Sequence, residues 1–288
     1  MNDLVRHVDL GNGASLTIRR THASDRALLR SLFHELSTED RYLRFFSPFD
    51  PGDEFLDRLA AANENGAIQL IAITERDGEP DEVTGEAGAW PRPNGNAELA
   101  ITVRPSARGW LGPYLLDALI EMSRAAGIPN LEAEVLITNR RMLALLRPRG
   151  YAASGHDGFH SGRFVISTSG ATPSWPETDD RPRLLVEAAG ARWDGEDTAK
   201  EDGVQLMVCP GPLGRASRRC PVLEGGHCPL ADGADAIVMH LGEPVNAELA
   251  GAHARLTPAV PVCVHPIGTS AFDVVKDAVH AAKEHHRS

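Results

Sequence analysis

The chain has 288 residues, of which 42% are hydrophobic and 24% charged, and its formal net charge at pH 7 is −11. This length suffices for two domains with a core each, and the composition is typical of a soluble globular protein. The acidic balance, without a basic patch interleaved with aromatic residues, argues against a nucleic-acid-binding protein, although it is compatible with a basic protein substrate. We find no signal peptide and no apolar run long enough to span a membrane, so the four cysteines are expected to be reduced thiols. A cytoplasmic protein is therefore expected.

The first elements follow from apolar spacing. A strand is predicted at residues 15–19, followed by an amphipathic helix whose apolar stripe covers residues 28–36. The segment LSTEDRYLRFF, residues 36–46, is either the end of this helix with aromatic residues in the core or part of a binding surface. A helix near residues 53–63 is expected next. Two strands follow it, at residues 68–74 and 83–90, with turns rich in glycine and proline.

Residues 97–151 carry the most regular pattern in the chain. Apolar and polar residues alternate over residues 97–103, which predicts a strand. A glycine-containing turn follows, and apolar residues at helical spacing then predict a helix that begins at Pro113 and ends before Gly127. A second strand over residues 131–137 and a short helix, which Asn139 can cap, complete a βαβα unit. Residues 154–158 and 162–168 are expected to close the sheet as a β-hairpin.

The turn between the first strand and the first helix of this unit is a candidate anion site. The first amide groups of a helix are unpaired donors, and the helix dipole favours negative charge beside them. Gly109 and Gly112 lie in the turn itself. Taken alone, such a turn is weak evidence of phosphate binding.

The order and spacing of these elements resemble the acyl-CoA-binding core of the GNAT-type N-acetyltransferase superfamily. The Asn-x-x-Met-x-x-Leu…Gly-Tyr ending, from Asn139 to Tyr151, is the most specific part of the resemblance. The segments IRRTHASDRALLRSLFHELSTEDRYLRFF and VTGEAGAW…NAELAITV resemble bacterial protein-lysine acetyltransferases within this superfamily. The resemblance implies an α/β GNAT fold over residues 14–169, with a mixed central sheet flanked by helices. It also implies acetyl-CoA as the acetyl donor.

Acetyl transfer to an amine needs a base that removes a proton from the ammonium form, often through water. A partly buried carboxylate, whose pKa rises toward neutrality, suits that role. Glu98 is the predicted base because it occupies the position of a catalytic glutamate in related acetyltransferases; the alternative is a solvated strand residue. Glu86, one strand earlier, is a weaker second candidate.

The resemblance further implies that backbone groups at the strand end and in the turn do most of the cofactor binding, with arginines neutralising phosphate charge. The predicted cofactor-binding residues are Ile101, Thr102, Val103, Arg104, Arg108, Gly109, Gly112, Asn139 and Met142. In protein-lysine acetyltransferases the segment at residues 36–46 lies along the acceptor side of the cleft. The candidate acceptor-binding residues are Tyr42, Arg44 and Phe45.

Two positions depart from the family pattern. In the ungapped register the polar residue and one glycine of the family turn fall on Ala107 and Trp110, which puts an indole where backbone approaches phosphate. A one-residue deletion in the turn restores Arg108 and Gly109 to these roles. The tyrosine that often serves as general acid falls on Leu146. Acetyl transfer tolerates that loss, because a thiolate is a fair leaving group.

A linker is predicted at residues 170–182, which are aperiodic and rich in Pro, Ser, Thr and acidic residues. The alternative is a tail held over the first domain by Trp175. Beyond the linker, alternating strands and helices predict a smaller parallel α/β domain over residues 183–288. The expected strands are 183–188, 204–209, 234–241 and 260–265, and the expected helices are 246–256 and 271–284, with a weak helical segment around Asp197.

This second half resembles a degenerate, truncated response-regulator receiver domain. The phospho-acceptor aspartate of such domains falls on His240, and Glu187 alone represents the acidic cluster. A buried or capping histidine is the alternative to phosphohistidine at His240. The resemblance implies a module used for contacts, through which the chain could form homo-oligomers.

The loop over residues 210–233 replaces a receiver helix and is rich in cysteine. Cys209, Cys220, His227 and Cys228 are potential zinc ligands, but they form no Cys-x-x-Cys pair, and adjacent side chains rarely bind one ion. Buried apolar thiols or a redox-active cysteine pair are the alternatives. No metal site is predicted.

Together these observations predict an acetyl-CoA-dependent N-acetyltransferase of protein lysine amines with a C-terminal regulatory or interaction domain. The alternatives are a catalytically weakened acetyl-CoA-binding regulatory protein and an acetyltransferase of small-molecule amines. The expected partner is a protein or small-molecule amine, with neither nucleic acid nor membrane.

Overall fold

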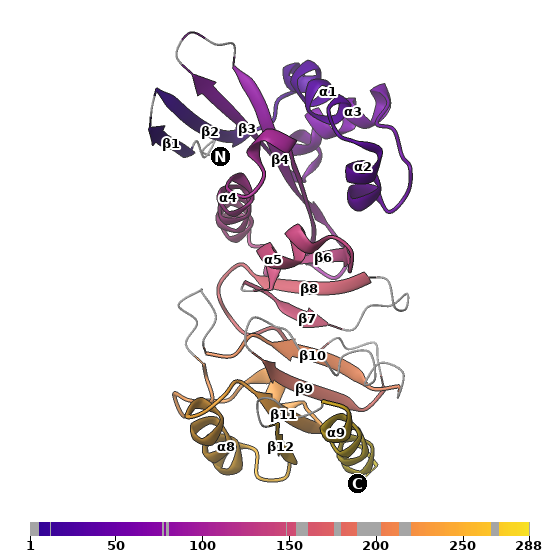
Figure 1. Cartoon of the computed structure of the whole chain (residues 1–288), viewed down its shortest axis with the longest axis vertical. Coiled ribbons are helices and arrows are strands. Elements are labelled where there is room, and N and C mark those ends of the chain that lie inside the picture. The colour runs from indigo at the N-terminus through magenta and orange to yellow at the C-terminus, as the bar shows by residue number, and fades with distance from the viewer. Residues whose placement is uncertain are drawn as a thin grey trace. The chain divides into compact units, whose positions relative to one another are not determined.

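The computed structural model describes residues 6–11, 13–76, 78, 81–147, 149–153, 161–175, 180–188, 203–212, 220–265 and 271–287. The chain divides into two compact units, Met1–Arg141 and Met142–Ser288, which we call the first and second units. Figure 1 shows the helices and strands in chain order. None of the helices in the described ranges is both long and apolar enough to cross a membrane.

A mixed sheet forms the centre of the first unit. Its strands, in their order in the sheet, are β1 (Arg6–Gly11), β2 (Ala14–Arg20), β3 (Ile68–Arg76), β4 (Glu82–Pro91), β5 (Ala97–Val103) and β6 (Asn130–Leu136). Neighbours from β1 to β5 pair antiparallel, whereas β5 and β6 pair parallel. The helices are α1 (Arg26–His34), α2 (Thr38–Phe45), α3 (Asp53–Ala60), α4 (Leu111–Ala125) and α5 (Arg140–Leu146), whose last residues belong to the second unit.

Helices cover both faces of this sheet (Figure 1). On one face, Ile71 of β3 packs in a buried cluster with Leu32 of α1 and Leu56 of α3. On the other face, α4 lies so close to β4 that a Cβ added to Gly85 would be 2.9 Å from a side-chain carbon of Leu111. The face beneath α1 to α3 carries every second residue of the central strands and contains the polar site described below.

The parallel strands β5 and β6 part after a short ladder. Only two residue pairs join them in the described structure, at Ala97 and Glu98 of β5. In contrast, β4 pairs with β5 along its whole length, up to Val103. Residues 99–103 of β5 therefore have a strand partner on one side only within the described part of the chain.

The second unit contains the strands β7 (Tyr151–Ala153), β8 (Ser161–Ser167), β9 (Arg183–Ala188), β10 (Gln205–Cys209), β11 (Ala236–His240) and β12 (Val262–Val264). They lie in the order β8-β7-β10-β9-β11-β12. The pairs from β10 to β12 are parallel, whereas β7 pairs antiparallel with both β8 and β10. The predicted parallel arrangement of the C-terminal strands is confirmed. Its helices are α7 (Pro229–Asp232), α8 (Val245–Leu256) and α9 (Ala271–His285).

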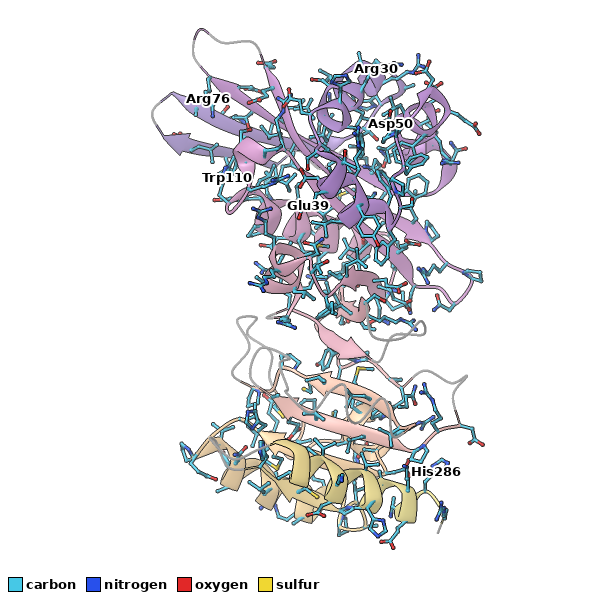
Figure 2. All side chains as sticks on the ribbon, turned by 45° about the vertical axis from the view of Figure 1, so that its right-hand side comes forward. Arg30, Glu39, Asp50, Arg76, Trp110 and His286 are labelled. Carbon is cyan, nitrogen blue, oxygen red and sulfur yellow. The ribbon has the colours of Figure 1, made fainter. Side chains whose placement is uncertain are left out.

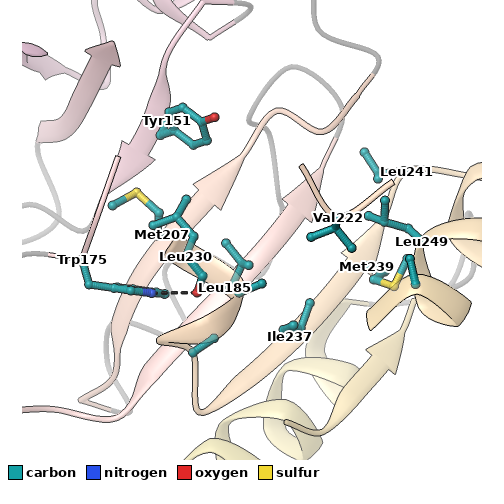
Figure 3. Packing of buried hydrophobic residues seen from close by; sticks show 13 residues of the cluster. Tyr151, Trp175, Leu185, Met207, Val222, Leu230, Ile237, Met239, Leu241 and Leu249 are labelled. Carbon is teal, nitrogen blue, oxygen red and sulfur yellow. Dashed lines mark hydrogen bonds between the residues drawn. The ribbon is translucent and has the colours of Figure 1, made fainter. Parts of the chain in front are cut away.

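Trp175 lies in the core of the second unit. Its indole Nε1 donates a hydrogen bond to the carbonyl oxygen of Leu230 at 2.8 Å, and its ring packs in a cluster that includes Tyr151, Met207 and Ile237 (Figure 3). The segment predicted as a linker thus contributes a core residue. Independent folding of the halves on either side of this segment remains a prediction.

Most predicted elements occur at or near their predicted positions. Of the predicted hairpin, the strand at 162–168 is present as β8, which pairs antiparallel with β7. The helix after the glycine turn begins at Leu111, two residues earlier than the proline at which we expected it. The predicted strand at 154–158 and the weak helical segment around Asp197 lie outside the described residues. We did not predict β1, whose RHVDLG sequence has little apolar character and which pairs at the edge with β2.

Candidate active site

Glu98, the predicted base, lies at the closed end of the fork between β5 and β6, paired in register with Glu132. Its side chain is 57% exposed and accepts a hydrogen bond from Nη2 of Arg92 at 3.0 Å. The Glu98 side chain is therefore more exposed than we expected of a general base. It is accessible to water, and its role remains a prediction.

Glu86, the second candidate, lies at the centre of the same sheet face. The β4–β5 register places it opposite Thr102, and the β3–β4 register places it opposite Ile71. Its side chain is 0% exposed. Oε2 accepts a hydrogen bond from Nε2 of Gln69 at 2.6 Å, and Oε1 accepts one from the Thr102 hydroxyl.

Arg44 is the positively charged partner of this buried carboxylate. Its Nε lies 3.6 Å from Oε1 of Glu86 and donates a hydrogen bond to Oγ1 of Thr102 at 3.2 Å. Its guanidinium carbon also lies 5.0 Å from the centre of the Phe45 ring. Arg44, predicted to line the acceptor side, thus joins α2 to the strand predicted to bind the cofactor.

Gln69 is oriented by the absence of a side chain at Gly88. A Cβ added to Gly88 would lie 2.4 Å from Oε1 of Gln69 and 2.8 Å from Nε1 of Trp90. Glycine therefore makes room for both polar groups over β4. The Oε1 atom of Gln69 is buried and has no hydrogen-bond partner in the described structure.

The turn before α4 contains Arg108, whose Nη2 contacts Oδ1 of Asp40 on α2. Asp40 also forms a capping box with Ser37 at the start of that helix. Burial raises the pKa of the Asp40 carboxyl, but hydrogen bonds from Arg108 and Ser37 outweigh this effect, so the pKa is below its ordinary value. The positive charge of Arg108 in this turn is therefore already paired with the carboxylate of Asp40.

The start of α4 has the features expected of an anion site. Trp110 occupies the N-cap position (Figure 2), and its side chain makes no capping hydrogen bond. Its ring lies edge-on to that of Tyr114, with 6.4 Å between the ring centres. Gly109 has a φ of +91°, which a residue with a side chain rarely adopts. Gly112 follows within the first turn of the helix.

Arg104, by contrast, points into the protein. Its side chain is 7% exposed and forms ion pairs with Glu35 of α1 and Glu82 of β4. It also lines a pocket of about 430 Å³ together with Ser31 and Asp81, among others. Two carboxylates thus already neutralise the charge of Arg104, whose role in binding a phosphate remains a prediction.

The other predicted acceptor-side residues differ in environment. Tyr42 is 47% exposed, whereas Phe45 is half-buried and packs edge-on against Phe49 and Phe55. Phe45 therefore contributes to the aromatic packing that joins α2 with α3. Tyr42 remains accessible to a ligand.

The predicted residues near the far end of the cofactor arm lie around α5. Asn139 directly precedes this helix, and Met142 lies within it, as the first residue of the second unit. Leu146, at the family position of the general acid, is fully buried. Ile101 and Val103 are half-buried on β5 and flank the buried Thr102.

Two polar pairs lie at the carboxyl ends of the parallel strands of the second unit. Nε2 of His253, on α8, lies 3.2 Å from Oε1 of Glu187, and both side chains are buried. Nδ1 of His240 lies 2.8 Å from Nδ1 of His265, with the two rings stacked. His240, at the position of the receiver phospho-acceptor, thus contacts another histidine.

The cysteines of the second unit are free thiols. Burial raises the pKa values of Cys209, Cys220 and Cys228, and the nearby Glu187 raises them further. Thiols of this kind remain protonated and are poor nucleophiles, which disfavours a redox-active pair. Within the described ranges, no three His, Cys, Asp or Glu side chains are placed to hold a metal ion.

Residues 29–151 match the model of the acetyltransferase (GNAT) family. The chain is similar to the crystal structure of the GNAT domain of S. lividans PAT, with 22% identity, a TM-score of 0.50, and coverage of 57% of this chain and 96% of that chain. It is also similar to a GNAT superfamily phosphinothricin acetyltransferase from Sinorhizobium meliloti in complex with AcCoA, at 21% identity over 53% of this chain and 88% of that chain, with a TM-score of 0.44. A ribosomal-protein-alanine N-acetyltransferase from Brucella melitensis is 25% identical over 51% of this chain and 96% of that chain, with a TM-score of 0.42. The predicted GNAT fold is confirmed by the family match and by the S. lividans domain.

Proposed function

We propose that this protein, in which residues 29–151 form a GNAT-type N-acetyltransferase domain, transfers an acetyl group from acetyl-CoA to a lysine amine of a protein. GNAT acetyltransferases use acetyl-CoA as donor. The observation that carries the proposal is the fork in the sheet, where β5 loses its parallel partner after Glu98. A strand edge with unpaired amide and carbonyl groups is a template for an extended ligand that carries amides of its own.

The chain around this fork fits the cofactor. Backbone groups of Ile101, Thr102 and Val103 would pair with the pantetheine arm, since this part of β5 is open on one side. The uncapped first amides of α4 and the left-handed Gly109 would receive the pyrophosphate. Asn139 and Met142 would lie near the far end of the arm. When bound, the thioester supplies the activated acetyl group and a thiolate leaving group.

Proton removal from the acceptor ammonium is the step that the chain itself must supply. Glu98 would act as general base through water, because its carboxylate is exposed at the closed end of the fork. Arg92 would then hold the carboxylate in place. Leu146 has no acidic proton, so this position would not supply a proton to the leaving thiolate.

A protein acceptor is supported by the surface near α2. Tyr42, Phe46 and Phe49 are large side chains exposed on or directly after this helix. Exposed aromatic residues are enriched where proteins bind one another. The net charge of −11 also favours a substrate rich in lysine. Small-molecule amines share the chemistry and are the alternative acceptor class.

For the second unit we propose a regulatory or interaction role in a cytoplasmic protein. The strand order β10-β9-β11-β12, with three parallel pairings, supports a receiver-like arrangement over residues 183–288. His240 occupies the phospho-acceptor position and contacts His265, which favours a module for contacts over a phosphorylated receiver. Homo-oligomers would form through this module.

Calorimetry with acetyl-CoA, followed by assays on lysine-containing proteins and on polyamines, tests the proposal. We expect binding in the micromolar range and turnover on proteins. Binding without turnover on any amine would instead support an acetyl-CoA-binding regulatory protein. Native affinity too weak to detect would exclude both functions.

A further inference from the structure

We propose that Glu86 is a positioning residue that, together with Thr102, fixes Arg44 as a hydrogen-bond donor to an oxygen atom of the acceptor. This inference rests on the proposed acetyl transfer and adds to it the residues that determine acceptor affinity. The carbonyl or carboxylate oxygen of a peptide acceptor is the chemical group that Arg44 would bind.

The first step of the argument is the charge of Glu86. A carboxylate that is 0% exposed requires compensation, because transfer of an unpaired charge out of water is strongly unfavourable. Arg44 is its only cationic partner in the described structure, at 3.6 Å. Gln69 satisfies the other carboxylate oxygen at 2.6 Å. Loss of the Glu86 charge would thus remove the electrostatic attraction that holds Arg44 against the sheet.

The second step is the direction imposed by Thr102. Its hydroxyl donates its single hydrogen to Glu86 and must therefore accept from Nε of Arg44. These hydrogen bonds fix both the position of the guanidinium group and the orientation of its plane. Because Thr102 lies in the β5 segment expected to bind the cofactor, Arg44 is held at a fixed place relative to the donor strand.

The third step concerns the rest of the guanidinium. Among the guanidinium nitrogens, only Nε has a polar protein partner in the described structure, and the side chain is 19% exposed. The two terminal nitrogens carry four further N–H groups in a planar fork that matches carbonyl and carboxylate oxygens. The adjacent exposed Tyr42 lies on the same helix, α2. An acceptor on this surface would therefore meet a donor that is already oriented.

Glu86 itself is enclosed by these partners. Its two oxygens accept from Gln69 and Thr102, and Arg44 covers the remaining charge. A carboxylate in this environment has no accessible position from which to take the proton of an ammonium group. Its contribution is therefore made through Arg44.

The test compares variants of the full chain on two single-lysine peptides, in which the lysine is flanked by glutamate or by glutamine. We expect Arg44→Gln, Glu86→Gln and Thr102→Val each to raise the acceptor KM about tenfold, the scale of a lost hydrogen bond to a charged group. The acetyl-CoA dissociation constant should change less than about twofold, because the backbone of β5 is unaltered. Thr102→Ser keeps the hydroxyl and should restore the native KM.

Arg41→Gln is the matched control. Arg41 is an arginine of the same helix, but it pairs with Asp50 at 2.9 Å and not with Glu86. Its acceptor KM should equal that of the native chain. The double variant Arg44→Gln/Glu86→Gln should be no worse than either single variant, because the two residues act as one unit.

The outcomes separate this inference from the function on which it rests. A tenfold effect on the glutamate peptide alone identifies a carboxylate as the bound group, and an equal effect on both peptides identifies a carbonyl. Acetyl transfer with an unchanged acceptor KM in Arg44→Gln would overturn the inference alone. A native chain that transfers no acetyl group to any amine would overturn the proposed function and, with it, this role of Glu86.

Discussion

Arg108 lies with Nη2 at 2.5 Å from Oδ1 of Asp40, so the turn before α4 is held against the first turn of α2. The pair connects the expected pyrophosphate site with the expected acceptor side. It also explains why Arg108, half-buried in the turn, has a defined position before any cofactor is bound.

The Asp40 pair predicts a dependence of stability on pH. Because hydrogen bonds from Arg108 and Ser37 outweigh the effect of burial, the folded-state pKa of Asp40 is lower than the unfolded value of about 3.9. The stabilisation is fully present above the unfolded pKa and is lost as the pH falls through the lower folded pKa. Asp40→Asn should therefore unfold more readily than the native chain at pH 7, and the difference should shrink below about pH 4. Urea melts at several pH values measure it; a difference that persists unchanged to pH 2 would contradict the assignment.

Substitutions of Arg108 and Trp110 test how the turn before α4 binds acetyl-CoA. Arg108→Ala should weaken binding by about 1.5–3 kcal/mol, the scale of a hydrogen bond to a charged group. Trp110→Gly should not tighten binding, because the Trp110 ring packs edge-on against Tyr114. Calorimetry on the native chain and both variants decides the matter. Tighter binding by Trp110→Gly would mean that the indole occupies the phosphate site.

Glu98→Gln separates catalysis from binding. Removal of a general base lowers turnover by roughly 10²-fold or more, whereas acetyl-CoA affinity should remain close to native. Arg92→Gln removes the ion pair but leaves the carboxylate, so it should lower turnover less than Glu98→Gln does. Turnover of Glu98→Gln at the native rate near neutral pH would exclude Glu98 from the mechanism.

Gly88→Ala tests the packing of the polar site. The added methyl group would lie 2.4 Å from Oε1 of Gln69, so the Gln69 side chain must leave its place beside Glu86. We expect a loss of about 1–3 kcal/mol in the free energy of unfolding, typical of overpacking. Gly162→Ala is the control, since its added methyl group would meet only Phe164, at 3.6 Å. Equal stability of both variants would show that this face tolerates a shift of Gln69.

Truncation tests the predicted domains. Chains that end near Gly170 and chains that begin near Arg183 should each melt cooperatively. The first should melt at a lower temperature than the full chain, because β7 would lose its pairing with β10 and Tyr151 would lose Trp175 and Met207 as neighbours. Calorimetric scans of both pieces and of the full chain measure this. Two pieces without a melting transition would place both halves in one cooperative unit.

The strand and helix pattern could be predicted from sequence because each signal is local. Residues 97–103 alternate between apolar and polar, and this local pattern predicted β5. The apolar stripe of α1 is likewise set by residues close in sequence, and it predicted that helix. The edge strand β1 was missed because half of its residues face solvent and its apolar signal is correspondingly weak.

The choice between the two carboxylates could not be made in this way. Glu86 lies among small residues in VTGEAGAW, where alternation gives no sign of burial, and its partners come from three other elements. Arg104 is a similar case, since its partner Glu35 directly follows α1 and is distant in sequence. Such pairings depend on the register of whole strands, which sequence spacing alone does not determine.

The 2.8 Å contact between Nδ1 of His240 and Nδ1 of His265 has a consequence for the chemical identity of the two rings. The contact is a hydrogen bond only while one Nδ1 atom carries a hydrogen and the other carries a lone pair, so the two rings must differ in where they carry hydrogen. The carboxyl ends of β11 and β12 are thus joined by two histidines, one of which donates through Nδ1 while the other accepts through Nδ1. Two distinct Nδ1 resonances in a nitrogen-15 spectrum should report this difference.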